Sequence, residues 1–255
     1  MRLGFDPEFF LKDQAGNFIS SIGLIGGTKD RPESIGEGCY VQEDNVAVEF
    51  NTPPCSNADE VIKHFEYAMN VVKDVIQDKG LSIAIVPSAE FGADQLEDPR
   101  VRQAGCEVDY NAWTGKTNKR ISLAKTSLRS AGGHIHVETT LDKREVIKWM
   151  DLFVGAWLIQ FDKDTKRRSL YGKAGAYRPK PYGVEYRTPS CFWISSHEMI
   201  RNTWRQVEKA VSTAQEYADN KEKFPEDIAE MVQDCINNSD MSLFAFLDAY
   251  WGINE

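Results

Sequence analysis

The stretch Gly132-Gly133-His134-Ile135-His136-Val137-Glu138 decides the fold prediction for this 255-residue chain. Its alternation of residue types predicts a β-strand, with His134, His136 and Glu138 on one face and two β-branched residues on the other. Half of the chain's four histidines thus meet beside a carboxylate, behind two glycines that permit a close approach of backbone or ligand. Such a face can hold a metal ion or a phosphate-bearing ligand, or it can be the solvated side of an ordinary strand.

Composition narrows the class of protein. A hydrophobic share of 42% is ordinary for a globular chain, and a formal net charge of −9 argues against broad binding to nucleic acid or anionic lipid. No run of about 18 apolar residues is present, so we expect no membrane span, and the N-terminus shows no signal-peptide pattern. Five scattered cysteines (39, 55, 106, 191 and 235) include no CxxC motif. They favour a reducing cytoplasm over a disulfide framework.

The order of elements predicts an α+β fold. Hairpin-like strands fill the first fifty residues, with a turn expected at residues 43–45 between strands over 39–42 and 46–51. Three helices follow at intervals, opened by the capping pairs Ser56/Asp59, Asp142/Glu145 and Ser195/Glu198. This order favours an antiparallel (mixed) sheet whose helices cover one face only. We expect a single domain over residues 1–255, with a core of about 1–217 and a helical extension over 218–255.

Four predicted strands place their polar residues on one face. These residues are Asp6 and Glu8, Glu49, the three polar residues of the opening stretch, and Glu185 with Arg187. A merely solvated face would favour Thr, Lys and Ser, and clustered carboxylates would repel one another. Divalent cations would remove that cost. Oxygen-rich ligands with one imidazole suit Mg²⁺ or Mn²⁺ better than a structural zinc.

A basic loop precedes the last of these strands. Residues 171–181 bring Lys173, Arg178 and Lys180 into a segment shaped by Gly and Pro. Guanidinium groups bind phosphoryl oxygens bidentately and stabilise charge on a transferring phosphoryl group. A solvated basic loop would have the same composition, so the loop alone leaves both interpretations open.

A conventional nucleotide-binding motif is missing from the sequence. Gly115-Lys116-Thr117 looks like the end of a P-loop, but Tyr110 stands where the first glycine is required, and no GxGxxG is present. Any ATP would therefore be bound by metal ions, by arginines and by the polar face of the predicted sheet.

Three segments resemble the catalytic strands of glutamine synthetase. They are Gly4-Phe5-Asp6-Pro7-Glu8-Phe9-Phe10-Leu11, the Gly-x-His-x-His strand at Gly133-His134-Ile135-His136, and the late Glu-x-Arg strand at Glu185-Tyr186-Arg187. The chain is more similar still to the phage and bacterial carboxylate–amine ligases (amidoligases) of this fold, in residues 48–53, 131–137 and 171–193. The resemblance runs from residue 4 to about 193. It implies a glutamine synthetase-type sheet with helices on one face and the active site on the other.

The resemblance also implies individual roles. The metal ligands, spread over two or more Mg²⁺ or Mn²⁺ ions, would be Asp6, Glu8, Glu49, His134 and Glu185. His136 would lie near the nucleotide, while Arg178 and Arg187 would grip the phosphates of ATP, with Lys173 as a further candidate. Asp6 replaces a Glu of the family, which shortens one ligand arm.

The implied reaction is the ATP-dependent ligation of a carboxylate to an amine. The γ-phosphoryl group converts the carboxylate to an acyl phosphate, which an amine attacks, while metals and the catalytic arginines Arg178 and Arg187 stabilise the charge. An acidic or histidine side chain would accept the amine's proton, and Glu138 is the candidate base.

Two other functions stay open at this point. A metal-dependent hydrolase could use the two histidines of the opening stretch, but only His64 and His197 remain as further nitrogen ligands, and both fall in predicted helices or caps. A non-catalytic nucleotide-binding relative would normally lose its metal ligands first, and here they all remain.

The substrates are predicted only as classes: a small-molecule or peptidic carboxylate and amine. Specificity should come from loops, and the polar region 92–130, including residues 109–113, could form the acceptor pocket or be an ordinary surface loop. The aromatic residues of the tail could serve a homo-oligomer or pack on the domain itself; they are Phe244, Phe246, Tyr250 and Trp251.

Overall fold

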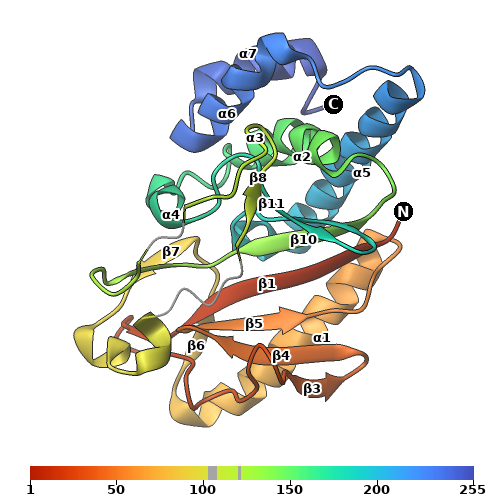
Figure 1. The fold of residues 1–255 in the computed structure, drawn as a ribbon. Coiled ribbons are helices and arrows are strands. Elements are labelled where there is room, and N and C mark those ends of the chain that lie inside the picture. Colours follow the sequence, from red (N-terminus) through yellow and green to blue (C-terminus); the bar gives the residue numbers. More distant parts are fainter. Residues whose placement is uncertain (103–107, 120–121) are drawn as a thin grey trace.

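A ten-stranded antiparallel sheet organises the computed structural model, which describes residues 1–102, 108–119 and 122–255 (Figure 1). The strand order is β3-β4-β5-β1-β10-β12-β11-β8, with β2 and β6 also paired to β1, while β7 and β9 form a separate pair. The strands are β1 (Leu3–Lys12), β2 (Phe18–Ile19), β3 (Glu33–Gly36), β4 (Cys39–Asp44), β5 (Ala47–Asn51), β6 (Ser82–Ala84), β7 (Ser88–Glu90), β8 (Tyr110–Asn111), β9 (Leu128–Ser130), β10 (Gly133–Glu138), β11 (Ala176–Lys180) and β12 (Gly183–Tyr186). The helices are α1 (Ala58–Ile76), α2 (Lys143–Met150), α3 (Ala156–Leu158), α4 (Thr165–Leu170), α5 (His197–Asp219), α6 (Ala229–Asn238) and α7 (Met241–Trp251).

The apolar face of the sheet is covered by helices. Phe65 of α1 packs edge-on against Phe5 of β1 at 5.7 Å and against Phe50 of β5 at 5.1 Å, between ring centroids. All three rings are buried in the main core, and α1 and α5 lie behind the sheet in Figure 1. The predicted α+β architecture with helices on one face is confirmed, and the opposite face remains for the polar residues.

The helix starts follow local hydrogen bonding. Asp142 caps α2 as expected, because its side chain accepts hydrogen bonds from the backbone at the start of the helix. The other two predicted caps are wrong by one residue: Asn57 accepts from the backbone of Glu60 at 2.9 Å, and Ser196 accepts from that of Met199 at 3.2 Å. Each true cap follows a residue that also favours capping, so the pattern could not separate the two.

The C-terminal residues pack onto the helical layer. Trp251 of α7 contacts Trp149 of α2 edge-on at 5.3 Å, and Phe244 is buried. Phe246 and Tyr250 remain 56% and 74% exposed. The predicted core boundary near residue 217 falls inside α5, which ends at Asp219. That residues 1–255 form a single domain, and that the protein forms a homo-oligomer, remain predictions.

The structure also bears on the expectations that the chain has no disulfide framework and no membrane span. Cys39, Cys55, Cys191 and Cys235 are buried free thiols, and Cys106 lies outside the described residues. Within those residues, none of the helices combines the length and the apolar character that a bilayer span requires.

A buried carboxylate joins β12 to the helical layer. Asp151 accepts hydrogen bonds from Trp113 Nε1 at 2.7 Å, Tyr186 Oη at 2.8 Å and Thr188 Oγ1 at 3.2 Å. Burial raises the pKa of Asp151 to about 7, against the effect of these donors. Tyr186 and Thr188 flank Arg187, so this buried network fixes the backbone that carries a predicted site residue.

We expect Asp151→Asn to lower the free energy of unfolding by about 1–3 kcal/mol. Trp113 can only donate, so the amide nitrogen must replace Oδ1, and the Tyr186 hydroxyl then loses its acceptor. Chemical denaturation measures the change. The exposed Asp74→Asn on α1 is the matched control and should behave as wild type. Unchanged stability of the Asp151 variant would show that the network is not a structural support.

Candidate active site

Strand register brings the predicted polar residues together on the face away from α1 and α5. The residues directly opposite one another on neighbouring strands are Asp6 and His134, Glu8 and Glu49, Glu185 and His136, and Glu185 and Arg178. Directly opposed residues have Cβ atoms about 4.5–5.5 Å apart. Residues as far apart in the sequence as Asp6 and Glu185 therefore form one continuous site.

The first group of ligand atoms surrounds Asp6. Its Oδ1 atom lies 3.3 Å from His134 Nδ1 and 3.1 Å from His136 Nε2, and Glu185 Oε1 lies 3.9 Å from His134 Nδ1. Asp6, His136 and Glu185 each bring one ligand atom within 4.8 Å of the others. Burial opposes ionisation of Asp6, but the charges of His136 and His134 hold its pKa well below the usual value. Both imidazoles are thus within reach of the two carboxylates.

Three cations enclose Glu185, which is only 1% exposed. Lys180 Nζ lies 2.7 Å from Oε2, Arg178 Nη1 lies 3.4 Å from Oε1, and Arg187 Nη1 also bonds to Oε1. Burial opposes ionisation, yet the Arg187 charge lowers the pKa of Glu185 to about 2. Three cations around one carboxylate give this part of the face a local excess of positive charge, which suits phosphate oxygens.

A second acidic group lies on the β4 side of β1. Glu8, Asp44 and Glu49 bring one ligand atom each within 4.8 Å of one another. Burial, reinforced by Asp44, raises the pKa of Glu8 to about 7. Burial followed by the charges of Asp6, Asp44 and Glu8 raises the pKa of Glu49 well above its usual value. Carboxylates held together at this cost form a donor set that fits a divalent cation.

Asp44 was missing from the predicted ligand set. The sequence placed it in a turn over residues 43–45, whereas β4 continues through Asp44, which pairs with Ala47 of β5. Asn45 has a positive φ of 57° and makes the tight turn possible. Extending the alternation of Tyr40 and Gln42 by one step would have put Asp44 on the polar face.

Lys173 and Glu138 lie apart from both acidic groups. Lys173 is exposed in the loop before β11, where its carbonyl oxygen accepts a hydrogen bond from Thr188. Glu138 is exposed at the end of β10, two residues beyond His136. Among the described residues, the cations paired with Glu185 include Lys180 rather than Lys173.

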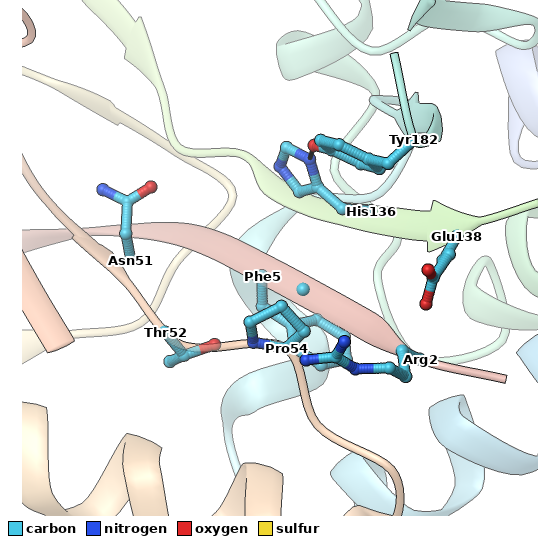
Figure 2. A pocket seen from close by; sticks show the side chains of 9 residues that line it. Arg2, Phe5, Asn51, Thr52, Pro54, His136, Glu138 and Tyr182 are labelled. Carbon is cyan, nitrogen blue, oxygen red and sulfur yellow. Dashed lines mark hydrogen bonds between the residues drawn. The ribbon is translucent and has the colours of Figure 1, made fainter. Parts of the chain in front are cut away.

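A pocket of about 350 Å³ opens beside His136 (Figure 2). The Nδ1 atom of His136 lies 2.6 Å from the hydroxyl of Tyr182, while Nε2 faces Asp6. His136 therefore stands between the pocket and the Asp6 group. The residues that line the pocket are Arg2, Gly4, Phe5, Asn51, Thr52, Pro54, His136, Glu138 and Tyr182.

Residues 109–113 lie at the edge of the sheet and pack against the helical layer. Tyr110 and Asn111 form β8 at the edge of the sheet. Trp113 packs against Phe224 in the helical layer and donates to Asp151. Residues 103–107 and 120–121 of the predicted acceptor loop lie outside the described residues.

The remaining histidines lie on helices. His64 of α1 has its Nδ1 atom 3.7 Å from Cys39 Sγ, and His197 of α5 pairs with Glu66 at 3.0 Å. Neither joins His134 and His136, so within the described residues these two histidines have no third imidazole beside them, and any further ligand of the hydrolase alternative would be a carboxylate.

Family comparisons identify the class of enzyme. Residues 2–149 match the family described as glutamate-cysteine ligase family 2 (GCS2), and residues 125–230 match the phage phiEco32-like COOH.NH2 ligase type 2 family. Both families join a carboxylate to an amine, which makes this protein a carbon–nitrogen ligase. The first match covers more than half of the chain, so the chain belongs to glutamate-cysteine ligase family 2.

Solved structures resemble the chain only weakly. One is described as "Apo GmaS without ligand" and another as "Crystal structure of novel glutamine synthase homolog". Each is 12% identical, has a TM-score of 0.36 and covers 98% of this chain, which spans 68% and 66% of their respective lengths. No curated protein matches the sequence.

Proposed function

We propose that the protein is an ATP-dependent carboxylate–amine ligase that forms an amide or peptide bond through an acyl phosphate. The observation that carries this proposal is the convergence of two acidic groups and three cations on one sheet face, beside a pocket. The acidic groups suit divalent cations, the cations suit phosphates, and the family joins carboxylates to amines.

Two cation sites follow from the donor sets. Asp6 and Glu185 would hold one Mg²⁺ or Mn²⁺ together with His134, whose Nδ1 atom lies 3.3 Å and 3.9 Å from their oxygens. His136 also brings a ligand atom within 4.8 Å of both carboxylates and would lie beside the same cation. Glu8, Asp44 and Glu49 would hold another. Bound cations would neutralise phosphate charge and position ATP for transfer. Burial, followed by the charges of neighbouring carboxylates, raises the pKa of Glu8 and of Glu49. These shifts support the proposal, because a bound cation would favour the ionised form of both groups.

The pocket beside His136 would receive the nucleoside part of ATP. Its volume of about 350 Å³ lies within the usual range for small-ligand sites, about 300–1,000 Å³. Phe5, Pro54 and Tyr182 offer apolar surface, and His136 would contact the phosphates where the pocket meets the Asp6 group. Glu138 lines this pocket on the side of His136 away from His134, so we assign it to nucleotide binding rather than to the base role predicted from sequence.

The arginines would act on the transferring group. Arg178 and Arg187 both reach Glu185 and are buried, so their guanidinium groups are held in place before the substrate binds. Fixed cations in a site with little water stabilise the charge of the transferring phosphoryl group without reorganisation. Lys180 would add a third charge from the same hairpin, and the exposed Lys173 remains a weaker candidate.

Hydroxylamine offers a test that does not require the natural amine. An acyl phosphate transfers its acyl group to hydroxylamine and gives a hydroxamate. We expect a panel of amino acids and other carboxylates to include at least one that yields ADP and hydroxamate in equal amounts, only with ATP and Mg²⁺ or Mn²⁺. Absence of both products across the panel, together with no Mg²⁺-dependent ATP binding in calorimetry, would contradict the proposal.

A further inference from the structure

We propose that Tyr182 is a positioning residue, whose hydroxyl group fixes the ring of His136 between the Asp6 group and the pocket. The proposal rests on the proposed function, because it assumes that His136 contacts the phosphates of ATP. It adds a residue to that site which the alternation of the strands does not reveal.

The contacts of His136 use both ring nitrogens. Nδ1 lies 2.6 Å from the Tyr182 hydroxyl, a contact drawn in Figure 2. Nε2 lies 3.1 Å from Asp6 Oδ1. The two rings also lie against each other, with centroids 6.1 Å apart and planes inclined by 39°. Turning the imidazole about its Cβ–Cγ bond would break both polar contacts, so the two partners together define one orientation.

Asp6 alone is a poor support for this ring. Its Oδ1 atom is shared with His134 Nδ1 at 3.3 Å, and Asp6 is a proposed cation ligand. When its oxygens face a cation, Tyr182 remains as the partner that holds the imidazole. At metal sites, the partner that hydrogen-bonds the second ring nitrogen of a histidine commonly controls affinity, and Tyr182 makes the same kind of contact with His136.

Backbone contacts hold the turn that carries Tyr182 in place. Tyr182 lies in the short turn between β11 and β12, and its carbonyl oxygen accepts a hydrogen bond from Thr139 at 3.1 Å. Gly183 follows with a φ of 156°, and a Cβ atom there would lie 2.0 Å from the carbonyl oxygen of Val137. The turn is therefore pressed directly onto β10, the strand that carries His136.

The ring and the hydroxyl group of Tyr182 have separable roles. The residue is 48% exposed, and its ring forms part of the pocket wall. Tyr182→Phe keeps the wall and removes only the bond to His136. Tyr182→Ala removes both the ring and the bond. The difference in affinity between the two variants therefore measures the contribution of the ring to binding.

A double-mutant cycle tests whether Tyr182 acts through His136. Calorimetry with Mg²⁺ and a non-hydrolysable ATP analogue gives the dissociation constant for wild type, Tyr182→Phe, His136→Ala and the double variant. We expect Tyr182→Phe to weaken binding by about 10–100-fold, and to have no further effect once His136 is alanine. Tyr250→Phe on α7, another exposed tyrosine and one outside the proposed site, is the control and should bind as wild type.

The possible results separate the two proposals. Equal losses from Tyr182→Phe with and without His136 would mean that the hydroxyl group acts elsewhere, and would overturn this inference alone. Wild-type affinity in Tyr182→Phe would overturn it as well. A wild-type protein that does not bind the analogue in the presence of Mg²⁺ would overturn the proposed function first, and this inference with it.

Discussion

Glu185→Gln should lower ATP-dependent turnover by roughly 100–1,000-fold. Glutamine has the same shape, but it removes the negative charge around which Arg178, Lys180 and Arg187 are arranged. It also removes one oxygen ligand from the proposed cation site beside Asp6. The variant therefore loses the metal and the arrangement of the phosphate-binding cations in a single step.

Steady-state ADP release at saturating ATP and Mg²⁺ measures this effect, and thermal unfolding shows whether the variant remains folded. Glu208→Gln on α5 is the matched control, because that side chain is exposed and lies outside the site. Its turnover should equal that of wild type. Near-wild-type turnover in a folded Glu185 variant would remove Glu185 from the active site.

Alternation along each strand predicted which residues share a face, and this part of the site follows from the sequence. His134, His136, Glu49 and Glu185 all lie on the polar face because a strand repeats every two residues. Alternation says nothing about which strands are neighbours. The contact between Asp6 and both imidazoles depends on β1 pairing with β10 in one particular register, and that register comes from the whole sheet.

The residues that the sequence did not reveal lie where strands end. The sequence predicts a turn at residues 43–45, whereas β4 includes Asp44. Tyr182 belongs to a turn between two strands, so alternation assigns it no face. Its position depends on the close approach of Gly183 to Val137, a contact between segments far apart in the chain. Local patterns thus predict the site residues within strands better than those at strand ends and in turns.

The acidic face also has a cost for stability. Glu8, Asp44 and Glu49 are close together, with Glu49 buried and the other two partly buried. The pKa values of all three are raised, first by burial. A carboxylate that is harder to ionise in the folded chain than in the unfolded chain weakens folding at neutral pH. Sites that bind charged ligands commonly carry such a penalty, which their ligand relieves.

Glu49→Gln should therefore raise the melting temperature of the metal-free protein and at the same time abolish most of its turnover. The amide carries no charge, so it removes the repulsion from Asp6, Asp44 and Glu8, and it can keep the hydrogen bond from Gln42. Each kcal/mol recovered should raise the melting temperature by roughly 2–4 °C in a chain of this size. The price is one ligand of the second cation site.

Thermal unfolding in EDTA and in Mn²⁺ separates the two effects. In EDTA the Glu49 variant should melt above wild type, whereas Mn²⁺ should stabilise wild type more than the variant, because only wild type keeps the full ligand set. Glu208→Gln should shift neither comparison. If the variant melts below wild type in EDTA and responds equally to Mn²⁺, Glu49 supports the fold instead of holding a cation, and the second cation site would have to be abandoned.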